Sequence, residues 1–406
     1  MKKITTNTTL AALALASSVT SLSADPIEAA LDDSKKQLSE TIPGTFSVNA
    51  RLRYEVFDLD NGNPALDRDG TSIRVRYGYT TPDFEGFKAS IEGETLSRVG
   101  GEHDDIHPLD DAGDGTDLNQ AWVSYTNADF GSAKVGRQIY ALDDQRFIGH
   151  VGWRQNIQVF DAATFAYTGV EGLTVNGFYI DERHLVNGAH NETNSFGLNV
   201  SYAFAPAFKL TGFYYDIEGD DVGNAGTTNK TVGARAAGSF KFEELTLKYT
   251  ASFATQGDVE TGEEGDYFAG DLSAVFSGVT VGAGFEIMEA GFRTPYATVH
   301  KFSGFADVFA TSSLTGIAQG LEDYYVYAGY TIPVGNGIKA KVIYHWFDPE
   351  TGTGDYGDEL DLVAVYKLNK YLNLVGKYGS YSSDGGAGGV GGADKDMFTF
   401  ELNLKY

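Results

Sequence analysis

Two neighbouring segments of the sequence carry arginines at a spacing of two residues: Arg51 with Arg53, and Arg74 with Arg76. In an extended chain, residues two apart point to the same face, so each pair presents its guanidinium groups in one direction. If the two segments form a hairpin, the four groups make a basic ladder that can bind carboxylates. The ladder can set a preference for anions, or it can pair with acids such as Glu55 and fill a polar interior. The sequence leaves both interpretations open.

Both segments alternate between apolar and polar residues, and so does the end of the chain. In 48–56 one row reads Val, Ala, Leu, Tyr, Val and the other Asn, Arg, Arg, Glu; residues 398–406, FTFELNLKY, repeat the pattern. A period of two indicates β-strands with an apolar and a polar environment on opposite faces. An Arg or Lys facing lipid at mid-bilayer costs about 2–4 kcal/mol, so in a membrane barrel the charged row must face the lumen.

The same pattern continues from residue 45 to the end, with connections that are alternately short and long. This arrangement is typical of an all-β, transmembrane, antiparallel up-and-down β-barrel with short periplasmic turns and long extracellular loops. We expect about 18 strands, at 45–58, 71–80, 87–97, 117–127, 132–140, 158–168, 173–182, 192–203, 208–217, 228–240, 244–255, 264–276, 278–288, 321–331, 337–347, 356–367, 371–382 and 394–406.

The N-terminal residues predict export. Residues 1–24 have two lysines, an apolar stretch and small residues at the end, which is the pattern of a signal peptide. Residues 25–44 form a short periplasmic segment with a helical pattern, and 45–406 form the barrel, which we place in the outer membrane of a Gram-negative-type bacterium. The absence of cysteine excludes a disulfide scaffold. The net charge of −26 argues against nucleic acid as a partner.

The polar rows supply the predicted pore lining. These residues are Arg51, Arg53, Glu55, Arg74, Arg76, Lys88, Glu92, Glu94, Lys134, Arg235 and Lys248. Arg137 instead follows Val135 on an outward row. Either a bulge at Gly136 turns Arg137 inward, or Arg137 lies above the lipid.

The long connection 141–157 is unusually apolar for an exposed loop. It carries Asp143, Asp144, Arg146 and Arg154 among apolar residues. We expect it to fold into the barrel and narrow it, with both arginines near the path; a loop packed on the rim is the alternative.

Other long loops are acidic, and 101–117 is the clearest case. They suit a solvated outer surface that divalent cations bridge to lipopolysaccharide. The group His103, Asp104, Asp105 and His107 lacks the spacing of a calcium loop, so we predict no metal site and no cofactor.

Three segments resemble the alginate-export family of outer-membrane barrels and its porin-like relatives: 136–162, 292–309 and 320–330. The resemblance implies an outer-membrane channel, with an arginine-rich lumen in the members that pass polyuronate. The mixed charge of the inner face in this sequence favours small solutes or oligosaccharides.

The leading hypothesis is therefore a channel for passive or facilitated diffusion of small hydrophilic solutes, either anion-preferring or of the saccharide/uronate type. Outer-membrane lipid, lipopolysaccharide and the solute are the expected partners, and a homo-oligomer is open. A structural or adhesive barrel is the alternative, followed by a barrel hydrolase. His184 lies close to Asp181 and Glu182, but no nucleophile motif accompanies it, so we predict no catalytic residues.

Overall fold

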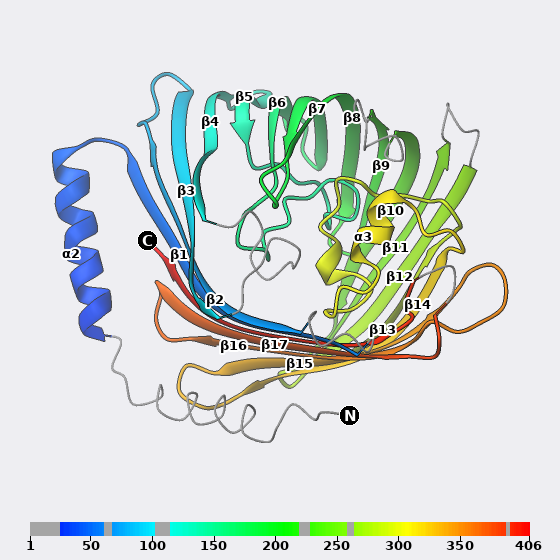
Figure 1. The fold of residues 1–406 in the computed structure, drawn as a ribbon. Helices are drawn as coiled ribbons and strands as arrows, with labels where there is room; N and C mark the ends of the chain where they lie inside the picture. Colours follow the sequence, from blue (N-terminus) through cyan, green and yellow to red (C-terminus); the bar gives the residue numbers. More distant parts are fainter. Residues whose placement is uncertain (1–24, 61–66, 102–113, 219–227, 258–263, 387–389) are drawn as a thin grey trace.

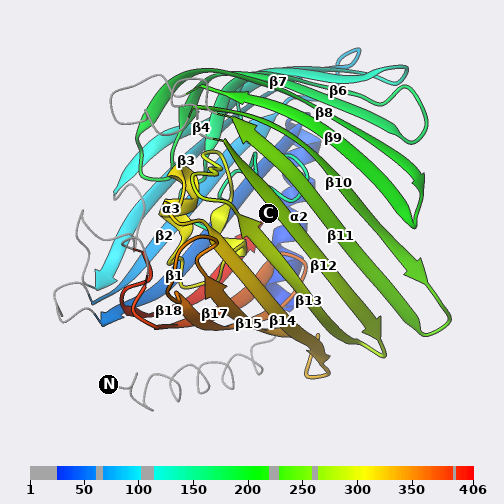
Figure 2. The ribbon, with the colours of Figure 1, turned by 90° about the vertical axis from the view of Figure 1, so that its right-hand side faces the viewer.

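A computed structural model describes residues 25–60, 67–101, 114–218, 228–257, 264–386 and 390–406. The predicted signal peptide and the group from His103 to His107 lie outside these residues. The described chain forms one antiparallel sheet of eighteen strands, in which β1 pairs with both β2 and β18 and so closes the barrel. Figure 1 shows the closed wall, and Figure 2 shows the tilt of its strands. Closure leaves no strand edge unpaired, as a membrane-spanning sheet requires.

The strands follow the chain in order around the barrel. The first nine are β1 (Thr45–Asp60), β2 (Arg68–Thr80), β3 (Phe87–Gly101), β4 (Gly115–Asn127), β5 (Gly131–Gln138), β6 (Val159–Tyr167), β7 (Leu173–His184), β8 (His190–Ala205) and β9 (Phe208–Ile217). The second nine are β10 (Asn229–Lys241), β11 (Leu245–Gly257), β12 (Glu264–Phe276), β13 (Val279–Met288), β14 (Leu321–Ile332), β15 (Ile338–Asp348), β16 (Gly357–Lys367), β17 (Leu372–Ser383) and β18 (Asp394–Lys405). The predicted fold class and the strand count within the described residues are confirmed.

The register explains why the alternating pattern gives a wall with two faces. Leu52 of β1 lies opposite Leu402 of β18 and Ile73 of β2, and this row is partly exposed on the outside. The next residue along, Arg53, lies opposite Glu401 and is buried inside. One residue of slip would exchange the two rows, so the apolar requirement of the lipid fixes the register.

Two long connections fold into the barrel instead of standing above it (Figure 1): 139–158, here called the first inner loop, and 289–320, the second inner loop. The second contains the short helices η2 (Val299–Lys301) and α3 (Ala310–Thr315). The main cluster of buried apolar residues lies between these loops and the wall, with Ile148 and Phe309 contributed by the loops and Phe160 by the wall. The apolar side chains of the first inner loop are therefore buried inside the barrel.

Helix α2 (Asp25–Thr41) lies outside the barrel, near the C-terminal end of the chain (Figure 1). Asp32 accepts hydrogen bonds from Lys370 Nζ and Tyr371 Oη, both at 2.6 Å. Lys35 lies 5.7 Å from the ring centre of Tyr406. Among the described residues, no helix has both the length and the apolar character needed to cross a membrane.

Candidate functional site: an arginine wall beneath an inner loop

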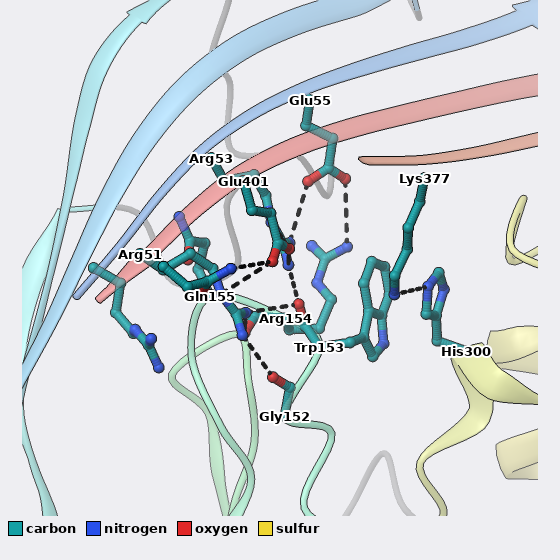
Figure 3. A network of polar contacts seen from close by, with 12 residues as sticks. Arg51, Arg53, Glu55, Gly152, Trp153, Arg154, Gln155, His300, Lys377 and Glu401 are labelled. Carbon is teal, nitrogen blue, oxygen red and sulfur yellow. Dashed lines mark hydrogen bonds and ion pairs between the residues drawn. The ribbon is translucent and has the colours of Figure 1, made fainter. Parts of the chain in front are cut away.

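The arginines of β1 hold the first inner loop by its backbone (Figure 3). Arg51 Nη1 donates to the carbonyl oxygens of Trp153 and Arg154, each at 2.9 Å, and Nη2 donates to that of Gly152 at 3.2 Å. Arg53 also donates to the carbonyl oxygen of Trp153. A guanidinium offers five donors in a rigid fork, so two arginines fix three consecutive carbonyl groups of the loop.

Carboxylates on β1 itself and on the neighbouring strands balance most of this charge. Arg53 Nη2 lies 2.7 Å from Glu401 Oε1, and Arg53 Nη1 lies 3.3 Å from Glu55 Oε2. Arg51 Nε lies 3.6 Å from the other oxygen of Glu401. The sequence-level alternative, in which these groups pair and fill a polar lumen, therefore describes Arg51 and Arg53. This alternative also describes Arg76, which forms a buried ion pair with Glu94.

Arg51, Arg53, Arg74 and Arg76 are called the arginine wall below. Within it, Arg74 is the exception. Its side chain is 1% exposed, and one of its terminal nitrogens donates to the Asn49 side chain. Among the described residues, no carboxylate lies within ion-pair distance of Arg74, and its Nε has no hydrogen-bond acceptor. The register causes this, because β2 places Arg74 opposite Arg51 on one side and Leu96 on the other. Glu94 attracts Arg74 from a greater distance. A buried cation without a carboxylate in direct contact is costly, so the site favours an anion.

A cavity of about 380 Å³ opens beside Arg74. It lies between the wall and the first inner loop, towards the end of the barrel with the short turns. Its lining residues are Asn49, Arg51, Arg74, Arg76, His150, Gly152, Ile157, Asn373, Val375, Glu401, Asn403, Leu404 and Lys405. Burial, with a further contribution from Arg76, lowers the pKa of His150. His150 therefore adds no positive charge. The cavity is lined by three arginines, one lysine and a single carboxylate, Glu401, which already pairs with arginines.

The second inner loop locks against the first. The imidazole of His300 stacks on Trp153, with ring centres 3.5 Å apart and planes inclined by 12°. Its Nδ1 donates to Asp307 Oδ1 at 3.0 Å, and its Nε2 accepts from Lys377 Nζ at 3.0 Å. Burial lowers the pKa of His300 to about 4, although Asp307 opposes the shift. The neutral ring can thus accept from Lys377, which joins both loops to β17.

Acids of β16 hold the second inner loop from another side. Glu359 accepts from the backbone N–H of Ala306 at 2.7 Å, and Asp361 from that of Phe305 at 3.1 Å. On the same wall, His345 Nδ1 donates to Asp323 Oδ1 at 2.8 Å. Glu359, Asp361 and Asp323 are called the acid wall below. Our site prediction did not include them, although the alternation in the predicted strand 356–367 could have identified Glu359 and Asp361 as inward residues.

The structure turns the predicted pore-lining residues towards the interior, in different settings. Lys88, Lys134 and Lys248 lie near the short-turn end, and Lys134 contacts the ring of Trp122 at 4.5 Å. Arg235 pairs with Asp144 of the first inner loop. Glu92 accepts from the side chains of Asn119 and Gln120.

The residues of the first inner loop act mainly as anchors. Asp143 accepts from Asn199 at 2.6 Å, and Arg154 lies 3.9 Å from Glu55. Arg146 was expected near the path, but it is 1% exposed and pairs with Glu286 at 2.7 Å. Its placement differs because the apolar residues around it draw that part of the loop into the core.

Arg137 lies on the outer surface, with no register shift at Gly136 in the β4–β5 pairing. Of the two alternatives left by the sequence, the bulge is therefore excluded. Its guanidinium pairs with Asp161 at 2.8 Å.

A closed antiparallel barrel of this size, with charged inner walls and two loops folded inside, defines the class of outer-membrane channels. The chain belongs to the alginate export family, whose model matches residues 43–292. It is therefore a porin-like channel of the Gram-negative outer membrane and not an enzyme, and the family prediction is confirmed.

Solved porins share the fold at low sequence identity. Acinetobacter baumannii OccAB4 is 14% identical, with a TM-score of 0.69 over 90% of this chain and 99% of that one. Pseudomonas aeruginosa OccK9 (OpdG) is 14% identical, with a TM-score of 0.70 over the same shares. Pseudomonas aeruginosa OpdK, solved with vanillate, is 12% identical, with a TM-score of 0.67 over 89% of this chain and 98% of that one. No curated protein matches the sequence significantly.

Proposed function

We propose that the channel prefers anions and passes small carboxylate-bearing solutes, with uronates as the leading class. The observation that carries this proposal is Arg74, a buried guanidinium that has no carboxylate partner in the described part of the chain and that lies beside a cavity of about 380 Å³. A solute carboxylate that enters the cavity supplies a counter-charge for Arg74. Arg51 and Arg76 line the same cavity and add to the positive potential.

The rest of the site suits transient binding. Arg51, Arg53 and Arg76 already have carboxylate partners, so an entering anion competes for them and is held weakly. Conduction requires binding that is strong enough for entry and weak enough for release. One unpaired guanidinium among paired ones meets this requirement. The vanillate in the structure of OpdK is also a carboxylate, which supports testing aromatic acids beside uronates.

The decisive test is the reversal potential of the purified protein in a planar bilayer across a KCl gradient. We expect anion selectivity for the wild type, and a shift towards cation selectivity for Arg74→Met. Lys88→Met is the matched control, because it removes one positive charge from an exposed position at the short-turn end. Equal shifts in the two variants would mean that overall lumen charge matters and Arg74 does not. Cation selectivity of the wild type would overturn the proposal.

Block of the KCl current separates the solute classes. Glucuronate should reduce the current at concentrations at least several-fold lower than glucose, and this difference should disappear in Arg74→Met. Equal block by both sugars in the wild type would refute the uronate preference while leaving a saccharide channel. Contact with lipopolysaccharide, assembly into homo-oligomers and the periplasmic position of residues 25–44 stay predictions.

A further inference from the structure

Five charged or titratable side chains meet on the outer surface of β5 to β8, near the end of the barrel with the long connections. They are Arg137, Asp161, Glu182, His184 and His190. None of them belongs to the channel interior. We propose that Asp161, Glu182 and His184 bind one divalent transition-metal ion of the zinc class, with His190 or water as the fourth ligand. This inference is independent of the proposed anion preference.

A β-bulge creates the cluster. Ala162 pairs with Ile180, and both are buried on the inner face, whereas the next pair outward is Asp161 with Glu182. Asp181 is the extra residue. Without it, the alternation from Ile180 would turn Glu182 and His184 inward, away from Asp161. Bulges re-aim side chains in this way next to functional sites.

The distances within the cluster suit a tetrahedral ion. His184 Nε2 lies 3.2 Å from Asp161 Oδ2 and 3.4 Å from Glu182 Oε2, and the three ligand atoms lie within 4.8 Å of one another. Ligands at about 2.0–2.1 Å from Zn²⁺ in a tetrahedron are roughly 3.3–3.5 Å apart. An ion can therefore enter with little movement of His184 and both carboxylates.

His190 supplies an additional imidazole from the neighbouring strand. It is the register partner of His184 across the β7–β8 hairpin, and its Nε2 lies 3.8 Å from Glu182 Oε1. Its side chain is 65% exposed, so it can rotate towards the ion. Two imidazoles with two carboxylates suit Zn²⁺, Co²⁺ or Ni²⁺, whereas Ca²⁺ and Mg²⁺ take oxygen ligands.

Arg137 limits the affinity and orients the site. Its Nε and Nη2 each donate to one oxygen of Asp161 at 2.8 Å. The bond to Oδ1 can persist while Oδ2 binds the ion, which is how groups behind a ligand commonly fix its orientation. Its positive charge opposes a cation, so we expect weaker binding than in a structural zinc site.

The test uses the full chain folded in detergent micelles and titrated with ZnCl₂ by calorimetry. All proteins carry His103→Asn and His107→Asn, so that these two histidines cannot contribute to the measured Zn²⁺ binding. We expect one Zn²⁺ per chain, and at least a ten-fold loss of affinity in Glu182→Gln and in His184→Gln. Co²⁺ should show the intense visible absorption of a four-coordinate ion, and His184→Gln should abolish it.

The folded state of each variant is checked by the heat-dependent migration of the barrel on gels and by KCl conductance. Both should match the parent protein. If His184→Gln does not fold, Glu182→Gln should still weaken Zn²⁺ binding at least ten-fold. Unchanged affinity in all folded variants, or a six-coordinate Co²⁺ spectrum, would overturn the proposal and leave the cluster as a network of ion pairs.

Discussion

The two inner loops are held by opposite parts of the backbone. In the arginine wall, Arg51 and Arg53 donate to carbonyl groups of the first inner loop. In the acid wall, Glu359 and Asp361 accept from N–H groups of the second. A loop inside a barrel loses water from its backbone groups and must find other partners for them. Walls of opposite charge satisfy both kinds of group and bring the loops together at His300 and Trp153.

The largest effect is expected from breaking the arginine wall at Arg53. Arg53→Met leaves Glu401 and Glu55 buried without their main partner and releases the carbonyl of Trp153. Removing one partner of a buried ion pair costs about 3–5 kcal/mol. We expect a loss of this size in the free energy of unfolding by urea in micelles, with a higher single-channel conductance. Lys88→Met should leave the unfolding free energy and the conductance near wild type. If Lys88→Met and Arg53→Met lose the same stability, the contacts of Arg53 with the first inner loop are unimportant.

The junction between the loops should respond to acid. The folded pKa of His300 is about 4 and the unfolded value about 6.5, so the unfolded chain binds the extra proton first. Stability should therefore fall as pH drops from 6.5 to 4, by up to about 3 kcal/mol. Protonation would also set a second cation against Lys377, with Arg53 nearby and Asp307 as the neighbouring counter-charge.

The comparison variant for this prediction is His300→Gln, a neutral side chain that can still accept from Lys377 and donate to Asp307. The difference between the pH profiles of unfolding for the wild type and His300→Gln gives the contribution of His300 alone, because the other titrating groups are common to both proteins. Parallel profiles over this range would contradict the prediction.

The acid wall depends on a close approach of the loop backbone. Gly304 has φ +86°, and a Cβ there would clash with Glu359 Oε2. Gly304→Ala should cost about 2–3 kcal/mol, from the left-handed backbone and from displacement of the carboxylate. Gly385→Ala is the matched control, because Gly385 has φ +107° and no atom of the described residues lies within 4 Å of the added Cβ. Equal losses in unfolding free energy would show that contact with Glu359 adds nothing.

The smallest effect is expected outside both walls. Asp32 joins α2 to Lys370 in an exposed ion pair at 2.6 Å. Exposed pairs contribute little because water and salt screen them. Asp32→Asn should leave the melting temperature and the conductance within experimental error of wild type. A clear loss of melting temperature or conductance would show that α2 contributes to the stability or the function of the barrel.

Much of the fold was predictable because the lipid imposes it on every strand. The alternation around Arg53 and Leu52 gave the direction of both side chains, and the short and long connections gave the strand order. Helices η2 and α3 were not predicted, since short helices inside a long loop have no periodic pattern. The bulge at Asp181 was also missed, because one extra residue changes the face of a side chain without changing composition.

By itself, the sequence determined the alternating strands, the closed barrel class, the inward arginines and the inward tendency of 141–157. These properties are local, because each depends on a residue and its neighbours against lipid or water. Only the tertiary structure decided that Arg53 is paired while Arg74 is not, that His300 stacks on Trp153, and that Arg146 is an anchor. Those outcomes depend on the register of adjacent strands and on contacts between segments more than a hundred residues apart, which no local pattern encodes.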